Sequence, residues 1–338
     1  MQEAMFYEKK ENKIVRCFLC SHNCVIQESK KGICRVRINR NGALYTLVYG
    51  KLISEAIDPI EKKPLFHFNP GSLTYSIATA GCNFNCMNCQ NFEISQLPKK
   101  TENILGEFVK PEKVISSAKK YDSLSIAYTY TEPIVWFEYW RDAAAAGHEK
   151  GLKSVMISAG YINSEPLAGL VRELDAIKID LKAYDEEFYR EICSAGLQPV
   201  LETLIQIRKA GTWLEIVNLI IPTLNDDEKH IDELCKWVVE NLGTDVPIHF
   251  TRFYPTYKLR NLPPTPLGSV EKAREIAVAR GIKFPYVGNV PSGHPGESTY
   301  CPGCGRTVVE RAGYTVLSID IKDGKCSSCG APIPGIWA

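Results

Sequence analysis

Three closely spaced cysteines offer the most specific chemistry in this sequence. Cys82, Cys86 and Cys89 follow the pattern C-x3-C-x2-C, directly after a largely apolar run at residues 73–80. Three thiolates can hold three corners of an iron–sulfur cube and leave the fourth iron open, whereas a structural zinc ion takes four ligands. The spacing therefore favours a 4Fe-4S cluster with an open iron over a zinc knuckle or a pair of redox thiols.

A second set of cysteines lies near the N-terminus, at Cys17, Cys20, Cys24 and Cys34. Four thiolates so close in sequence predict a closed metal site that holds either zinc or a second iron–sulfur cluster. Zinc sites favour two C-x2-C knuckles, and Cys17 and Cys20 form one here, which weakens the zinc interpretation without deciding it. His22 lies among these cysteines and is expected to be an exposed loop residue.

A third set forms two C-x2-C knuckles, Cys301 with Cys304 and Cys326 with Cys329, each followed by glycine. This pattern predicts a zinc ribbon, with rubredoxin-like iron as the alternative. Residues 307–321 alternate enough to supply two or three short strands, and a module of this size needs a metal to fold. A structural role is favoured over docking of a protein or nucleic acid, and His294 is not expected to be a ligand.

Composition gives the cellular context. The chain has 338 residues, 13 cysteines, and 40 Lys and Arg against 39 Asp and Glu, so its net charge is +1. It has no apolar signal segment in residues 1–14 and no run of 18 apolar residues, which predicts a cytoplasmic protein that does not enter a membrane. Cysteines in such a compartment indicate metal binding rather than disulfides. Cys193 and Cys235 stand apart from the three sets and are expected to be buried apolar residues.

Strands and helices are expected to alternate from residue 73 onward, which predicts an α/β fold with a parallel sheet that closes into a full or partial (β/α) barrel. Before this region, residues 43–54 read as a strand or hairpin, and three X-Pro pairs near residues 58–70 indicate a linker. The expected strands are residues 73–79, 123–128, 154–158, 176–181, 214–221, 248–253 and 282–287. The expected helices are residues 111–120, 134–150, 166–174, 186–193, 199–210, 228–242 and 269–280.

The cysteine motif after a first barrel strand resembles the radical S-adenosylmethionine (SAM) superfamily, and residues 89–91 resemble its glycyl-radical activating-enzyme branch. The resemblance implies that the open iron is chelated by the amino and carboxylate groups of SAM. One electron from the cluster then cleaves the sulfonium to a 5'-deoxyadenosyl radical. Asn88 departs from the family, which usually has an aromatic residue before the third cysteine, and it makes the cluster edge more polar.

The resemblance also implies SAM contacts at the ends of the following strands, where chemistry sits in such barrels. Thr131 and Glu132 correspond to a segment that holds the SAM amino group, and Ser158 follows the next strand. A glycine-adjacent alanine, Ala159, replaces the amide usual in activating enzymes, so no contact is assigned to it.

Asp180 and Lys182 resemble the activating-enzyme Asp-x-Lys segment, and strand periodicity places both side chains on one side of the sheet. An internal ion pair, which could include Lys178, is the alternative role. Asn218 lies within an apolar strand and needs a partner if it is buried, for which the SAM ribose or carboxylate is suitable. Glu215, on the opposite face, is expected near the barrel base or paired with a basic residue, and a structural role is favoured for His249.

Residues 249–255, 262–266 and 286–289, together with the terminal cysteine module, resemble the radical SAM component of the AmmeMemoRadiSam group, which is related to pyruvate formate-lyase activating enzyme. This resemblance covers nearly the whole chain. It implies three parts: a four-cysteine metal module with a linker at residues 1–70, the barrel at residues 71–289, and a zinc-ribbon or rubredoxin-like module at residues 290–338.

The expected function is therefore reductive cleavage of SAM, followed by hydrogen abstraction from a substrate such as a glycine of a partner protein. An electron donor such as flavodoxin or ferredoxin would be required. Modification of another peptide, a small molecule or RNA is a rival activity, although nucleic acid is not favoured by the charge pattern. The alternative from another class is a non-catalytic iron–sulfur or zinc scaffold that binds no SAM.

Overall fold

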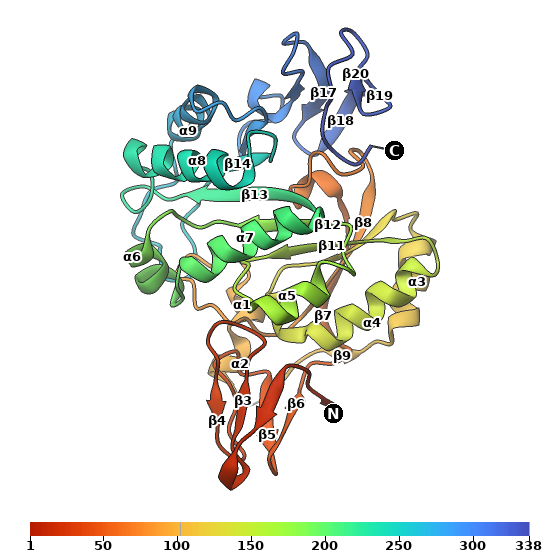
Figure 1. Ribbon diagram of the computed structural model, residues 1–338, viewed down its shortest axis with the longest axis vertical. Coiled ribbons are helices and arrows are strands. Elements are labelled where there is room, and N and C mark those ends of the chain that lie inside the picture. The colour runs from red at the N-terminus through yellow and green to blue at the C-terminus, as the bar shows by residue number, and fades with distance from the viewer. Residues whose placement is uncertain (102, 338) are drawn as a thin grey trace. The chain divides into compact units, whose positions relative to one another are not determined.

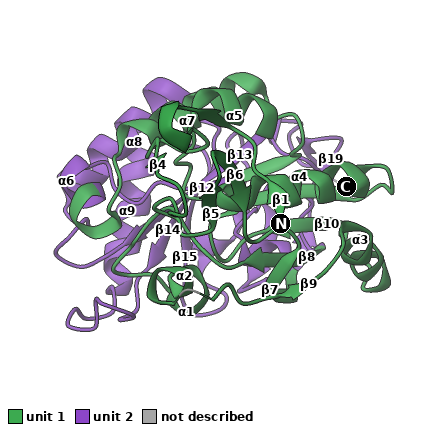
Figure 2. Ribbon diagram, turned by 90° about the horizontal axis from the view of Figure 1, so that it is seen from below, with its two compact units in different colours: residues 1–58, 73–177, 190–212 green, residues 59–72, 178–189, 213–338 purple. Residues whose placement is uncertain are grey.

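The computed structural model describes residues 1–101 and 103–337 (Figure 1). The chain divides into two compact units, each made of three segments (Figure 2). The first unit contains residues 1–58, 73–177 and 190–212, and the second contains residues 59–72, 178–189 and 213–338. Within the described residues, no helix is both long and apolar enough to cross a membrane.

The first unit begins with two small antiparallel sheets, in the strand orders β1-β6-β5 and β2-β3-β4. These strands are short, and their side chains alternate between core and solvent, as Val15, Arg16 and Cys17 do in β3. Their bounds are β1 (Gln2–Glu3), β2 (Tyr7–Lys9), β3 (Val15–Cys17), β4 (Val25–Ile26), β5 (Arg37–Arg40) and β6 (Ala43–Thr46).

The rest of the first unit consists of β/α units. Strand β10 pairs in parallel with β8 on one side and β11 on the other, and β7 pairs antiparallel with β9. The strands are β7 (Lys51–Pro59), β8 (Leu73–Thr79), β9 (Glu107–Phe108), β10 (Ser125–Tyr128) and β11 (Lys153–Ser158). The helices are α1 (Phe92–Ser95), α2 (Leu97–Lys100), α3 (Pro111–Lys120), α4 (Phe137–His148), α5 (Ser164–Leu170) and α7 (Gln198–Ala210). Strand β12 (Ala176–Asp180) is divided between the two units, with the boundary after Ile177.

The second unit contains the parallel strands β13, β14 and β15, with β14 in the middle, and the packed helix pair α8 and α9. Its C-terminal module has a three-stranded antiparallel sheet, β16-β17-β18, and a two-stranded one, β19-β20. The bounds are α6 (Glu186–Phe188), β13 (Trp213–Ile220), α8 (Glu228–Leu242), β14 (Ile248–Arg252), α9 (Leu267–Ala279), β15 (Pro285–Gly288), β16 (Thr299–Tyr300), β17 (Thr307–Ala312), β18 (Thr315–Ile319), β19 (Ile321–Lys322) and β20 (Lys325–Cys326).

The predicted alternation of strands and helices is confirmed, and two details near the start are different. Strand β7 runs through Asp58 and Pro59, which the sequence had indicated as linker. Residues 43–54 do not form a hairpin, because β6 pairs with β1 and β5 whereas β7 pairs with β9. The helix expected at residues 134–150 begins as a 3-10 turn, Pro133–Trp136, before α4.

Candidate functional site

The loop that carries Cys82, Cys86 and Cys89 begins where β8 ends. Two of its backbone amides are fixed from residues far along the chain: Asn85 N donates to Cys193 O at 2.9 Å, and Met87 N donates to Ile192 O at 2.9 Å. Cys193 is fully buried, as predicted, and so is Cys235. The loop conformation is therefore held by backbone hydrogen bonds and does not depend on the thiols alone.

Polar donors lie close to two of the three thiols. Phe84 N donates to Cys82 Sγ at 3.3 Å, and Ser95 Oγ lies 3.2 Å from Cys89 Sγ. Burial raises the pKa of Cys82 well above its usual value, and the charges of Glu132 and Cys86 raise it further. The raised pKa disfavours a free thiolate at Cys82, and three partly exposed thiols on one short loop fit three corners of an iron–sulfur cluster.

Two buried amide oxygens in the same loop have no hydrogen-bond partner within the described part of the chain, Asn83 Oδ1 and Asn88 Oδ1. A buried polar atom of this kind is costly unless something binds it. Asn88 Oδ1 is thus a buried acceptor that a ligand could satisfy, and the polar cluster edge expected at Asn88 stays a prediction.

Glu132 and Ser158 are brought together behind this loop. Ser158 Oγ donates to Glu132 Oε1 at 2.7 Å, and Ala159 N donates to Glu132 Oε2 at 2.9 Å. Glu132 is buried and also caps the following turn by accepting from Ile134 N at 3.2 Å. Thr131 Oγ1 donates to Thr79 O at 2.8 Å, so this hydroxyl ties the loop after β10 to the end of β8.

In the second unit, Asp180 lies between two lysines. Lys182 Nζ donates to Asp180 Oδ2 at 2.8 Å, and Lys178 Nζ donates to Asp180 Oδ1. Burial alone would raise the pKa of Asp180, but the two ammonium groups outweigh it and lower that pKa to about 2. Lys178 and Asp180 share one side of β12, and Lys182, two residues beyond the end of this strand, contacts the same carboxylate, which stays charged at any physiological pH.

Asn218 is buried in β13, in the second unit. Its Nδ2 donates to Leu181 O at 2.9 Å and to Lys182 O at 3.2 Å, while its Oδ1 has no partner among the described residues. The same carbonyl of Lys182 also accepts from Asn225 Nδ2 at 2.8 Å. Asn218 therefore positions the chain beside Asp180 and leaves one buried acceptor for a ligand.

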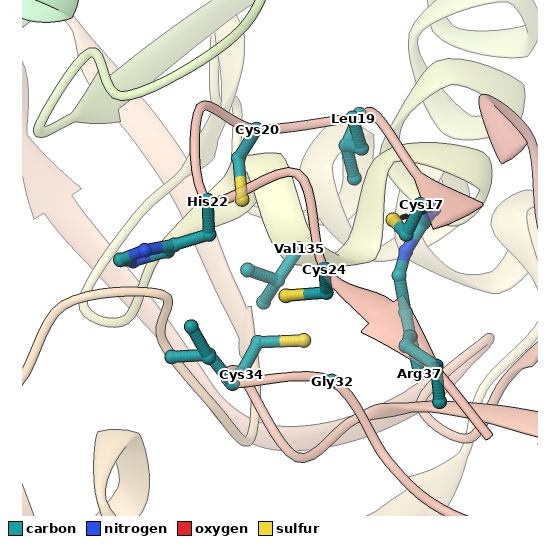
Figure 3. Close-up of a pocket in the computed structure, with 11 residues that line it drawn as sticks. Cys17, Leu19, Cys20, His22, Cys24, Gly32, Cys34, Arg37 and Val135 are labelled. Carbon is teal, nitrogen blue, oxygen red and sulfur yellow. Dashed lines mark hydrogen bonds between the residues drawn. The ribbon is translucent and has the colours of Figure 1, made fainter. Parts of the chain in front are cut away.

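The N-terminal cysteines surround a small cavity of about 10 Å³, shown in Figure 3. Cys17, Cys20, Cys24 and Cys34 all line it, and their other neighbours are mostly apolar. Arg37 also lines this cavity and is 2% exposed. Its Nη1 lies 3.6 Å from Cys17 Sγ, and its Nη2 pairs with Glu138 of α4. The sequence pattern did not single out Arg37, because its partner lies about one hundred residues away.

His22 is half-buried, so the expectation of an exposed loop histidine is wrong. Its Nε2 lies 2.8 Å from Asn83 O, and its ring contacts the ring of Tyr161. Burial lowers the pKa of His22, which favours the neutral ring at this contact. The imidazole therefore links the N-terminal module to the Cys82 loop. This hydrogen bond, rather than metal binding, is the contact that its Nε2 makes.

The C-terminal cysteines lie close enough for one metal ion. The ligand atoms of Cys301, Cys304, Cys326 and Cys329 all lie within 4.8 Å of one another. Cys301 Sγ is 3.5 Å from Cys329 Sγ, and Cys304 Sγ is 3.8 Å from Cys326 Sγ. A tetrahedral ion with metal–sulfur bonds of about 2.3 Å needs this spacing. His294 instead contacts Glu271 and caps a turn, as expected of a residue that is no ligand.

Glu215 and His249 belong to a buried polar network in the second unit. His249 Nε2 lies 2.7 Å from Glu215 Oε2, and the backbone amides of Phe66 and His67 both donate to this carboxylate. Glu215 is therefore paired with a basic residue, as expected, and the structural role favoured for His249 is confirmed.

Known proteins support the same interpretation. Residues 76–238 match the family model of the radical SAM superfamily. An uncharacterized protein of Methanocaldococcus jannaschii is 45% identical over 335 residues, which cover 98% of this chain and 99% of the relative. A candidate glycyl-radical enzyme activating enzyme of the same organism is 26% identical over 207 residues, 60% of this chain and 76% of that protein.

The fold agrees with a solved structure, a radical SAM methyltransferase from Sphaerobacter thermophilus. The two share 13% identity with a TM-score of 0.51, over 65% of this chain and 67% of that one. The architecture is thus the partial (β/α) barrel of radical SAM enzymes, and it carries a C-terminal four-cysteine cluster. With its cysteine loop at the end of β8, the chain belongs to the radical SAM superfamily.

Proposed function

We propose that this protein is an activating-enzyme-like radical SAM enzyme that abstracts a hydrogen atom from a polypeptide, with a glycine Cα–H as the first candidate. The observation that carries the proposal is the loop of Cys82, Cys86 and Cys89, whose conformation is fixed by Cys193 and Ile192. Similarity to a candidate activating enzyme supports the choice of a polypeptide substrate.

The three cysteines would hold three irons of a 4Fe-4S cluster, and SAM would bind the fourth. When bound, the cluster supplies the single electron that cleaves SAM. The protein's own contribution is to fix the three thiols, to shield the site from water, and to offer buried polar atoms such as Asn88 Oδ1.

Six residues are proposed to contact SAM. In the first unit, Glu132 is aligned by Ser158 and by the amide of Ala159, while Thr131 fixes the loop that carries it. In the second unit, Asp180 and Lys182 form a charged pair suited to the amino and carboxylate groups of SAM, and Asn218 offers a free acceptor.

SAM cleavage tests the proposal directly. The protein is reconstituted with iron and sulfide without oxygen and reduced with dithionite, and 5'-deoxyadenosine is measured with SAM present. We expect product from the wild type and from Cys235→Ala, a buried cysteine outside the three sets, and none from Cys86→Ala. A fully loaded wild type that neither binds nor cleaves SAM would support the scaffold alternative.

The substrate class needs a separate measurement. Peptides that contain glycine deuterated at Cα are incubated with the reduced enzyme and SAM, beside matched peptides with deuterium on alanine. Deuterium in 5'-deoxyadenosine from the glycine series alone would support the activating-enzyme role. Cleavage that is stimulated by RNA or a small molecule, without transfer from any peptide, would contradict it.

We also propose that the C-terminal site holds zinc. The sulfur spacing fits one tetrahedral ion, and the paired knuckles are typical of zinc ribbons. Metal analysis of the protein isolated before iron reconstitution tests this choice, since rubredoxin-like iron would give iron without sulfide at this site.

A further inference from the structure

The N-terminal thiols have a geometry different from that of a single-ion site. Among the described residues, the one group of three or more potential ligand atoms that all lie within 4.8 Å of one another is the C-terminal set. Cys17, Cys20, Cys24 and Cys34 line one cavity (Figure 3), but no three of their sulfurs lie within 4.8 Å of one another. Thiolates on one zinc ion lie about 4 Å apart, whereas thiolates on a cluster are farther apart because each binds a different iron.

The surroundings of this cavity also suit a cluster. Its wall is largely apolar, with Leu19, Ile26 and Val135 among the lining residues, and it includes the buried guanidinium of Arg37. Arg37 Nε has no hydrogen-bond partner within the described residues. Arg37 is paired with Glu138, so it adds no net charge, but its Nη1 lies 3.6 Å from Cys17 Sγ, and a hydrogen-bond donor beside a ligand sulfur makes reduction of a bound cluster easier.

The cavity lies next to the loop that carries Cys82. Gly81 has a φ of +105°, and a Cβ at this position would lie 2.6 Å from Val36 Cγ1 and 3.4 Å from Cys34 O. Gly81 therefore packs directly on the backbone of the N-terminal site. The path from the Cα atom of Cys34 runs through its carbonyl oxygen to Gly81, and one further Cα–Cα step of about 3.8 Å leads to Cys82. The Cα atoms of Cys34 and Cys82 are therefore no more than about 11 Å apart.

Two further contacts cross the same boundary. His22, which follows Cys20 by two residues, contacts Asn83 O at 2.8 Å. The Lys99 ammonium interacts electrostatically with Cys34 and also with the thiols of the Cys82 loop. The two sets of cysteines are thus neighbours within one compact unit, joined by backbone and charge contacts.

The four N-terminal cysteines differ in burial. As residues, Cys20 and Cys24 are partly exposed, whereas Cys17 and Cys34 are buried. The backbone of Cys34 lies against Gly81, next to Cys82.

We propose that Cys17, Cys20, Cys24 and Cys34 hold a second 4Fe-4S cluster that relays single electrons to the cluster on Cys82, Cys86 and Cys89. One electron enters from a low-potential iron–sulfur or flavin protein and reduces the N-terminal cluster. The same electron then passes inward, which oxidises the N-terminal cluster and reduces the second one. No bond forms or breaks and no proton moves in this step. The relay rests on the proposed SAM-cleaving function, whereas the presence of the N-terminal cluster does not.

The first test uses Cys86→Ala, which leaves the N-terminal thiols intact. After reconstitution, we expect this variant to keep about four acid-labile sulfides per chain and an electron paramagnetic resonance signal on reduction. Sulfide is decisive, because a mononuclear C-terminal site contains none. A variant without sulfide that holds a second zinc ion would overturn the proposal. This result is independent of SAM cleavage, so failure of the relay and failure of the proposed function are distinguishable.

The second test measures the relay. SAM cleavage is driven either by dithionite or by reduced ferredoxin, in the wild type, in Cys24→Ala and in the control Cys235→Ala. We expect the ratio of the ferredoxin-driven rate to the dithionite-driven rate to fall about tenfold or more in Cys24→Ala and to stay unchanged in Cys235→Ala. An unchanged ratio in Cys24→Ala would overturn the relay. If Cys24→Ala fails to fold, magnetic coupling between the two reduced clusters of the wild type, absent in Cys86→Ala, decides instead, and its absence would overturn the relay.

Discussion

The N-terminal and C-terminal four-cysteine sites have the same ligands and differ in almost everything else. The C-terminal sulfurs converge to pairs 3.5 and 3.8 Å apart, and two of the four cysteines are exposed. The N-terminal thiols surround an apolar cavity that includes a buried arginine. The two sites therefore share their ligand type and differ in the spacing of the sulfurs and in the residues beside them, so the number of cysteines alone does not predict which metal either site binds.

The two sites also differ in what they stabilise. Cys301 and Cys326 are members of the small core of the C-terminal module, together with Phe66, Val308 and Ile333. Loss of the zinc ion proposed for this site would therefore release two cysteines that belong to this core. In the N-terminal module, the comparable anchor is the buried ion pair of Arg37 and Glu138. Neither of these residues is a metal ligand.

The largest difference should appear when the C-terminal metal is lost. Cys326→Ser removes a buried ligand, and structural zinc contributes on the order of 10 kcal/mol to such small modules. We expect residues 299–337 to exchange amide hydrogens as an unfolded chain does, while residues 1–58 keep their protection. Hydrogen exchange measured by mass spectrometry checks this, with Cys235→Ala as control. Equal loss of protection in both modules would contradict the expected difference between the two sites.

The next effect concerns the N-terminal anchor. Arg37→Met leaves Glu138 buried without its cation, which typically costs about 3–5 kcal/mol. The double variant with Glu138→Leu removes both charges and should recover most of the loss in the free energy of unfolding. Denaturant titration measures all three proteins. Arg37→Met as stable as the wild type would show that the pair does not anchor the module.

Acid should weaken the contact of His67 with the C-terminal module, where His67 Nδ1 lies 2.6 Å from Pro334 O, and should affect the N-terminal module less. Burial lowers the pKa of His67 to about 4, against the opposing charge of Glu215, and His249 and Arg311 also face the ring. His67 is thus neutral when folded and protonated below about pH 6.5 when unfolded. Its contribution is complete above pH 6.5 and is lost as the pH falls toward 4, by about 3 kcal/mol.

Unfolding of wild type and His67→Gln between pH 7.5 and 4.5 measures this contribution. The free energy of unfolding should fall more steeply with decreasing pH in the wild type than in His67→Gln. Parallel curves would show that other groups, such as Glu215, cause the acid sensitivity.

The smallest effect concerns the boundary beside the N-terminal site. Gly81→Ala places a methyl group against Val36 at a φ of +105°, which should cost about 1–3 kcal/mol. The double variant with Val36→Ala should recover only the part of the lost free energy of unfolding that steric overlap causes. Thermal denaturation of both variants separates overlap from backbone strain, and full recovery in the double variant would exclude the strain.

The sequence predicted what depends on local pattern. Strand β8 and helices α3 and α8 were predicted with the bounds that the structure has, because periodic apolar residues and terminal signals such as Pro111 decide them locally. The paired knuckles likewise predicted the convergence of the four C-terminal sulfurs.

Long-range partners could not be predicted in this way. Neither the pairing of Arg37 with Glu138 nor the contact of His22 with Asn83 leaves a local signal, since each joins residues far apart in sequence. The extension of β7 through Asp58 and Pro59 was missed because a proline usually interrupts a strand, whereas Pro59 is the last residue of β7.

The pairing of Arg37 with Glu138 also implies an order of assembly. The four N-terminal cysteines leave the ribosome early, before the helix that supplies Glu138 has been made. Until then, Arg37 has no buried carboxylate to hold it. Metal loading of the nascent N-terminal module would therefore precede the closing of its ion pair, whereas the C-terminal site can be loaded only after Cys329 has been made.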